Sequence, residues 1–294
     1  MKPAGYSLGL VLVTASAVAW STAGLFTRLI PLDSWTMLAW RGIFGALGLA
    51  IVMLALERRN FTAGFRTMGW PGWLFVLVSA LGMIFFITSL NNTTVAHVAV
   101  IYATVPFLAA GLGWLVSREK PGASATVASL VALAGVIVMV GLGREGGIFG
   151  DLLALGMTLS MAVIMVIARR YHDIPVMPAA CLSALLSGLV CWPLGDPLAV
   201  TSHEFLMLAL FGLVNSAIGL ALFTLGARLL PAIETALIGS LDAPLAPLWV
   251  WLAFHETPGG STIAGGAIVF IAVAAHLVAG ATRMSKPVDN IQGG

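Results

Sequence analysis

Long apolar runs recur along the whole chain and limit what it can fold into. Ten stretches of about 18 residues or more, separated by Gly, Pro and charged residues, are each long enough to cross a bilayer as a helix. Composition agrees, because 60% of the residues are hydrophobic and 9% are charged, against roughly 25% charged in soluble proteins. We therefore expect an all-α integral membrane protein with ten transmembrane helices. The expected spans are residues 6–27, 34–56, 70–90, 94–116, 123–142, 150–167, 177–195, 203–225, 232–254 and 261–281.

The second half of the sequence repeats the first. A shift of 137 positions, which aligns residue 79 with residue 216, gives 14 identities over 46 positions without a gap. Trp114 then matches Trp251 and Glu119 matches Glu256, which a merely apolar composition does not explain. The chain is predicted to be an internal duplication. Its parts are a first five-helix repeat (1–142), a short glycine-rich linker (143–149), a second five-helix repeat (150–282) and a disordered tail (283–294).

Loop charges predict the orientation in the membrane, because cytoplasmic loops are enriched in Lys and Arg. With ten spans, one side holds eleven such residues and the other holds only Arg28 and Arg144. Both termini are therefore predicted to be cytoplasmic. Each half has an odd number of helices, so the halves insert in opposite orientations, as in the inverted-topology repeats of secondary transporters. The eleven residues are Lys2, Arg58, Arg59, Arg66, Arg118, Lys120, Arg169, Arg170, Arg228, Arg283 and Lys286.

Asp242 lies near the middle of the apolar stretch 232–254. A carboxylate at membrane depth is costly and normally faces a bundle interior or a water-filled cavity. Pro244 and Pro247 follow and remove two backbone donors, so they and Pro106 of the first repeat are candidate hinges. Asp242 could accept a proton or bind a substrate ammonium group; alternatively it is a structural carboxylate bonded to freed backbone near Pro244. Its repeat counterpart is Val105, so the duplication requires no charge there.

Other polar side chains inside the expected helices extend this hypothesis to a substrate pathway. Arg41 could bind a substrate carboxylate, or it could snorkel to the interface or pair with Asp33. His97 and Glu234 are repeat counterparts near helix starts, where boundary residues reach water. Ser and Thr could instead bond their own helices, whereas Trp20 lies too deep for the headgroup belt. The candidate pathway residues are Trp20, Ser21, Thr22, Arg41, Thr88, Ser89, His97, Tyr102, Ser160, Asn215 and Asp242.

Several classes of function are not supported by the sequence. It contains no HExxH, GxSxG or phosphate-loop pattern and no paired carboxylates on one span, so we expect no enzyme, cofactor or metal site. The net charge of +2 is dispersed, which excludes nucleic acid as a partner. Cys181 and Cys191 are about 15 Å apart on one expected helix and cannot form a disulfide. An intramembrane enzyme or a structural membrane subunit remains the alternative of another class.

A proline-bearing helix ends at Glu and Pro in both repeats. The pieces are Val105-Pro106-Phe107 through Arg118-Glu119-Lys120, and Leu241-Asp242-Ala243-Pro244 through His255-Glu256-Thr257. With ten spans and the inverted duplication, residues 6–282 resemble the drug/metabolite transporter superfamily, in particular EamA-type exporters. In that family an acidic residue commonly stands immediately before the second-half proline, whereas here Ala243 intervenes.

The resemblance implies a fold and a function. It implies a central cavity walled by helices one to four and six to nine, with helices five and ten outside it, so His276 is expected to serve packing. Length and loop pattern look most like the YddG-type aromatic amino-acid exporters. The expected protein is a multi-pass secondary transporter of a bacterial-type inner membrane that exports small metabolites, amino acids including aromatic ones, by alternating access. Proton coupling is a separate hypothesis that rests on Asp242, and the sequence leaves it open beside facilitated diffusion. The alternative within the superfamily is a drug or nucleotide-sugar carrier.

Overall fold

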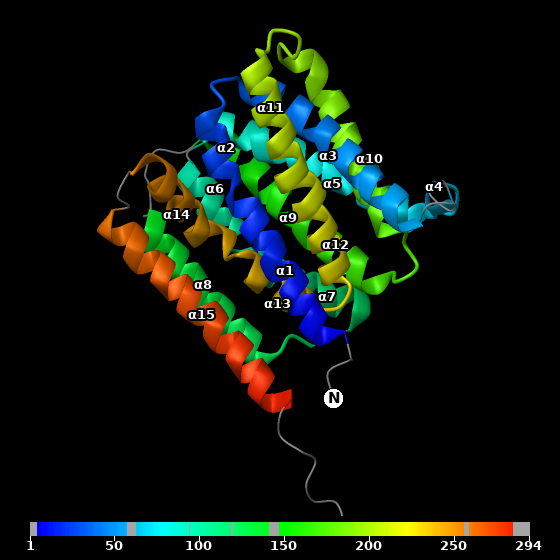
Figure 1. The fold of residues 1–294 in the computed structure, drawn as a ribbon. Helices are drawn as coiled ribbons and strands as arrows, with labels where there is room; N and C mark the ends of the chain where they lie inside the picture. The colour runs from blue at the N-terminus through cyan, green and yellow to red at the C-terminus, as the bar shows by residue number, and fades with distance from the viewer. Residues whose placement is uncertain are drawn as a thin grey trace, which may run out of the picture.

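The computed structural model describes residues 5–57, 63–93, 95–118, 120–140, 147–255 and 259–284, and every regular element in them is a helix (Figure 1). Eight helical stretches are long and apolar enough to cross a membrane, and two further apolar stretches, Ala123–Val138 and Gly260–His276, are shorter. The shorter two belong to α8 (Ala123–Val140) and α15 (Gly260–Met284). All ten coincide with the apolar runs of the sequence, which confirms the prediction of an all-helical membrane fold.

The fourth and ninth spans are each broken near the middle, and at equivalent positions. Helix α6 (Val95–Tyr102) is followed by α7 (Val105–Ser117), and α13 (Ala232–Gly239) by α14 (Asp242–Phe254), with all four boundaries 137 residues apart. Pro106 and Pro244 explain the breaks, because a proline has no N–H to donate to the preceding turn. Both second segments end at residues with positive φ, Arg118 at 56° and His255 at 55°. The structure therefore repeats a broken helix, as the duplication predicts.

Two other spans are irregular. The first is divided at Thr22 into α1 (Tyr6–Ser21) and α2 (Ala23–Leu29). The eighth consists of α11 (Ser202–Phe211), the π-helical segment η2 (Gly212–Gly219) and α12 (Leu220–Ala227). A π segment lets one turn project its side chains differently from a regular helix and often occurs at functional sites. The π segment lies near the middle of its span, whereas the break at Thr22 leaves 16 residues before it and 7 after it.

Glycines allow the closest helix crossing. Helix α3 (Ser34–Glu57) packs against α10 (Val176–Cys191), where a Cβ built on Gly42 would lie 2.6 Å from the Ala184 oxygen and from Gly188 Cα. A Cβ on Gly48 would lie 2.7 Å from the Ala217 side chain. These distances leave no room for a methyl group. Gly42 lies against α10, and Gly45 and Gly48 lie against η2, so small residues allow α3 to pack closely on both.

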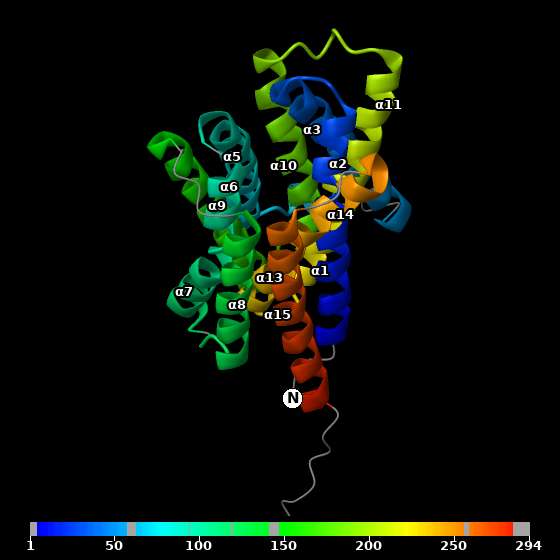
Figure 2. The same cartoon turned by 90° about the vertical axis from the view of Figure 1, so that its left-hand side faces the viewer.

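The remaining helices complete the bundle around this contact. Helices α5 (Trp70–Asn92) and α9 (Ile148–Arg170) pack together, with Phe75, Met165 and Phe223 among the largest fully buried side chains. Helices α8 and α15 lie side by side, at the edge of the bundle in Figure 1 and facing the viewer in Figure 2. The short segments α4 (Ala63–Arg66) and η1 (Trp192–Leu194) connect longer helices.

The start of α1 and the end of α15 lie at the same end of the bundle (Figure 1). A chain that crosses the membrane an even number of times begins and ends on the same side, so this arrangement is expected. The side of the membrane to which that end belongs stays a prediction from the loop charges. Glu119, Arg144 and Glu256, together with most of the expected linker and tail, lie outside the described residues.

Candidate transport site

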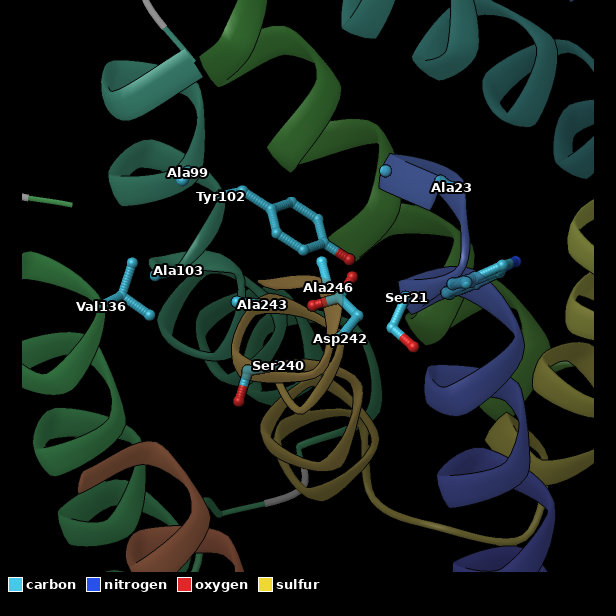
Figure 3. Close-up of a pocket in the computed structure, with 12 residues that line it drawn as sticks. Ser21, Ala23, Ala99, Tyr102, Ala103, Val136, Ser240, Asp242, Ala243 and Ala246 are labelled. Carbon is cyan, nitrogen blue, oxygen red and sulfur yellow. The ribbon is translucent and has the colours of Figure 1, made fainter. Parts of the chain in front are cut away.

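A cavity of about 210 Å³ lies where the broken helices meet (Figure 3). Roughly 300–1,000 Å³ is typical of pockets that hold drug-sized ligands, so this space suits a smaller molecule. Three of its walls come from the α1/α2 break, from the end of α6 and from the α13/α14 break. Val136 shows that α8, the fifth span, is not wholly outside the cavity, contrary to what the resemblance implied. The lining residues are Trp20, Ser21, Ala23, Gly24, Ala99, Tyr102, Ala103, Val136, Ser240, Asp242, Ala243 and Ala246.

Among the described lining residues, Asp242 is the one with a charged side-chain type. It is the first residue of α14, because the chain leaves α13 at Ser240 and Pro244 prevents the turn from continuing. At a helix N-terminus the peptide dipoles favour a negative charge. In Figure 3 the carboxylate points into the cavity, and the hydroxyl of Tyr102 points toward it. The arrangement presents a carboxyl group to a largely apolar space, where it can exchange a proton or bind a cation.

Two tryptophans hold the region of the α1/α2 break against neighbouring helices. Trp20 Nε1 donates to the Asn215 carbonyl at 3.0 Å, and its ring lies 4.8 Å from that of Phe223. Trp249 Nε1, from α14, donates to Ser21 Oγ at 2.7 Å. A tryptophan N–H away from water needs a hydrogen-bond partner. Trp20 finds this partner on η2, and Trp249 finds it on α1. Sequence reasoning missed Trp249, because the residue looks like any interfacial aromatic until its partner is known.

Arg41 lies beside the cavity wall and is only 8% exposed. Its Nη1 donates to Asn215 Oδ1 at 3.1 Å, its Nη2 lies 2.7 Å from the Met83 sulfur, and its guanidinium sits 5.5 Å from the Phe211 ring centroid. The Asn215 amide in turn donates to the Trp20 carbonyl at 3.2 Å. Arg41 is thus joined to the lining residue Trp20 through Asn215, although it is not itself part of the lining.

The pairing of Arg41 with Asp33, an alternative raised by the sequence, is not formed. Asp33 Oδ1 instead accepts the backbone N–H groups of Trp35 and Thr36, both at 2.9 Å, and so caps the start of α3. Partial burial opposes ionisation of Asp33, but hydrogen bonds from Thr36 and from the backbone outweigh it and lower the pKa of this carboxyl. The Asp33 carboxylate therefore caps α3 instead of binding Arg41.

Four further candidate pathway residues donate hydrogen bonds from their hydroxyls to backbone carbonyls of their own spans. Thr88 donates to the Ile84 carbonyl at 2.8 Å and Ser89 to that of Phe86 at 2.7 Å. Ser160 donates to Gly156 at 2.8 Å, and Thr22 donates to Ala19 at 2.6 Å. None of these four lines the cavity described above. Of the candidate pathway residues, the structure brings Trp20, Ser21, Tyr102 and Asp242 to the cavity, with Asn215 and Arg41 behind Trp20.

His97 and Glu234 lie away from the cavity and bind partners on other helices. His97 Nδ1 is 3.1 Å from both oxygens of Asp151 on α9. Glu234 accepts a hydrogen bond of 2.5 Å from the Tyr6 hydroxyl on α1, and His276 Nε2 on α15 is 3.9 Å from the same oxygen. Glu234 is only 9% exposed, so the expectation that it reaches water as a boundary residue was wrong. No local pattern indicated these long-range partners.

These features define a class of protein: a helical membrane protein with duplicated broken helices around a small, singly charged cavity. The model of the EamA-like transporter family matches residues 7–141 and 148–278. The chain belongs to the EamA-like transporter family, and it is a membrane transporter of small molecules. The resemblance drawn from the sequence is thereby confirmed at the level of the family.

Solved structures support the same fold. Twenty-nine solved chains match. One of them, titled "Crystal structure of protein", is 19% identical, with a TM-score of 0.81 over 93% of this chain and 99% of that chain. At this identity the likeness concerns the fold alone. A comparison with curated protein sequences found no match.

Proposed function

We propose that this transporter is a secondary carrier that exports small metabolites with an ammonium group, above all amino acids including aromatic ones. The observation that carries the proposal is the Asp242 carboxylate, the one charge on the wall of the cavity between the helix breaks. A carboxylate in an apolar space is costly unless a cation or a proton accompanies it. A substrate ammonium group would supply that cation.

The rest of the lining suits an amphipathic molecule. Ala99, Ala103, Val136 and Ala246 offer apolar contact, while Tyr102 and Trp20 offer aromatic faces. Aromatic rings stack on such faces, and ammonium groups also bind them. A nucleotide sugar, by contrast, would bring its phosphates close to the Asp242 carboxylate. This repulsion disfavours the nucleotide-sugar alternative and leaves a cationic drug as the second candidate.

Proton coupling follows from having a single carboxylate. A proton and an ammonium group compete for Asp242. When the cavity opens to the outside, a proton binds Asp242 and displaces the substrate. When the cavity opens to the cytoplasm, a new substrate molecule binds and displaces the proton. Carboxylates inside membrane domains commonly mark such proton pathways. With both termini in the cytoplasm of a bacterial-type inner membrane, this exchange drives export.

Alternating access requires the two ends of the cavity to open in turn. His97 binds Asp151 between α6 and α9, and Tyr6 binds Glu234 between α13 and α1. His97 and Glu234 are 137 positions apart, so they are repeat counterparts, and α6 and α13 lie toward opposite ends of the bundle (Figure 1). Each bond joins one repeat to the other. We propose that the two bonds are the gates, and that inversion of the repeats makes one the counterpart of the other.

Reconstitution tests the proposal. Purified protein in proteoliposomes would be assayed for counterflow of radiolabelled amino acids, cationic drugs and nucleotide sugars, at equal pH and with an imposed pH gradient. Amino acids with aromatic side chains are expected to exchange, and a proton gradient opposed to substrate movement is expected to accelerate it. Exchange of nucleotide sugars without exchange of amino acids would overturn the proposal.

A further inference from the structure

We propose that Arg41, with Asn215, is a carboxylate-binding subsite of the carrier, covered in this structure by the thioether of Met83. The proposal rests on the proposed function and deepens it, because a carboxylate at Arg41 and an ammonium group at Asp242 together define a zwitterionic substrate class, the amino acids.

The charge of Arg41 is buried without an anion. Only 8% of the residue is exposed, and its contacts are an amide oxygen, a sulfur and an aromatic ring. Within the described part of the chain, no carboxylate lies within ion-pair distance of it. A guanidinium inside a membrane domain is expensive and is normally paired. Because the described residues supply no anion, a ligand that supplies one would bind favourably here.

The backbone around Asn215 is built to hold this group in place. Asn215 lies in the π-helical segment Gly212–Gly219, the one π segment among the described residues. Its amide nitrogen donates to the carbonyls of Trp20 and Ala19, at 3.2 and 3.4 Å, which turns its side-chain oxygen toward Arg41. The amide orientation, the Trp20 indole bond and the guanidinium therefore form one network that ends at the cavity lining.

Met83 is a cover that a ligand can displace. A thioether is a weak acceptor, and methionine is unbranched and changes rotamer readily. A carboxylate binds a guanidinium through two parallel charge-assisted hydrogen bonds, which are about twice as strong as neutral ones. Exchange of the Met83 sulfur for a substrate carboxylate is therefore favourable once the Met83 side chain changes rotamer.

The two charged groups together predict which molecules the carrier prefers. A molecule with an ammonium group alone uses Asp242 and leaves Arg41 covered. A molecule with a carboxylate alone is repelled by Asp242. A zwitterion satisfies both groups, so amino acids should be preferred over their neutral amides, which have the same size and ammonium group.

The test compares phenylalanine with phenylalaninamide. Inhibition constants for counterflow would be measured in proteoliposomes, and ligand-induced shifts in the melting temperature would be measured in detergent. The parent should prefer phenylalanine by about tenfold or more, the range expected for a charge-assisted hydrogen bond. Arg41→Gln should remove this preference, because phenylalanine loses its carboxylate partner whereas the amide has none to lose. Arg170→Gln, which removes an exposed guanidinium elsewhere, should keep the preference.

A second pair of variants covers the case in which Arg41→Gln does not fold. Met83→Glu places a carboxylate where the sulfur contacts Arg41, so it should raise the melting temperature and abolish the preference for phenylalanine. Met83→Gln, its neutral match, should keep the preference. An equal affinity of the parent for both compounds, or an undiminished preference in Arg41→Gln or Met83→Glu, would overturn the assignment. If the parent binds neither compound, the proposed function itself fails; if it binds both equally, only the Arg41 subsite fails.

Discussion

Replacement of Asp242 by asparagine tests the centre of the proposed mechanism. Asparagine keeps the shape of the side chain but removes the charge and the titration. The described lining residues include no second carboxylate that could take over the role of Asp242. Loss of the negative charge at the start of α14 should cost about 0.3–1 kcal/mol of helix stability, which is small enough for the variant to fold.

The size of the expected effect follows from the contact that is lost. A hydrogen bond to a charged group contributes about 1.5–3 kcal/mol. At about 1.4 kcal/mol per tenfold, a substrate ammonium group should bind Asp242→Asn roughly 10-fold to 150-fold more weakly. If Asp242 carries protons without binding the ammonium group, exchange at equal pH should instead stay largely intact.

The assay separates these two versions. Counterflow at equal pH measures substrate binding, and transport against an imposed pH gradient measures proton coupling. Under the proposed mechanism Asp242→Asn weakens counterflow at equal pH and abolishes the acceleration of transport by the pH gradient. Asp196→Asn removes a carboxylate from an exposed loop residue and serves as the matched control, with both activities expected at the level of the parent. A folded Asp242→Asn protein that exchanges and responds to pH like the parent would refute both versions and leave Asp242 as a structural carboxylate.

Three further predictions concern stability and topology. Gly42→Ala should destabilise the fold by about 1–3 kcal/mol, because the new methyl meets backbone atoms of α10 at 2.6 Å. Gly111→Ala, with nothing within 4 Å of the new methyl, should instead gain about 0.5–1 kcal/mol of helix propensity. Unfolding in mixed micelles measures both variants, and equal effects would contradict the packing argument. Tyr6→Phe should cost about 1–3 kcal/mol by removing the donor to a buried carboxylate, and an unchanged unfolding curve would count against a gate at this bond. Cysteines introduced at Arg170 and Arg28 should react with impermeant maleimide from opposite sides of the membrane, Arg170 from the cytoplasm, and labelling of both from one side would defeat the predicted topology.

The sequence was informative wherever the physical signal is local. Hydrophobicity over about 20 residues predicts a membrane helix regardless of its neighbours, so the ten spans could be found without a structure. Prolines act on the turn that precedes them, so the breaks at Pro106 and Pro244 were likewise accessible. The cost of a charge at membrane depth singled out Asp242, and the structure places it on the cavity wall.

The same reasoning could not identify the partners of polar groups that are distant in sequence. Tyr6 and Glu234 are 228 positions apart, as are Ser21 and Trp249, and Arg41 and Asn215 are 174 apart. For Arg41 the sequence left a substrate carboxylate, snorkelling and Asp33 open, because each is compatible with its depth in the helix. The structure shows that Asp33 caps its own helix, and the packing of α3 against the π-helical segment shows that Asn215 meets the guanidinium.

By itself, then, the amino-acid sequence determined the membrane class, the span positions, the duplication and the one carboxylate at the centre of a span, since apolar length, repetition and charge burial act along the chain. The tertiary structure alone decided where the spans cross, which breaks surround the cavity and which polar groups meet. The physical reason is that helices in a bilayer associate through close packing and a few hydrogen bonds. Those contacts depend on the register between helices, which no single span encodes.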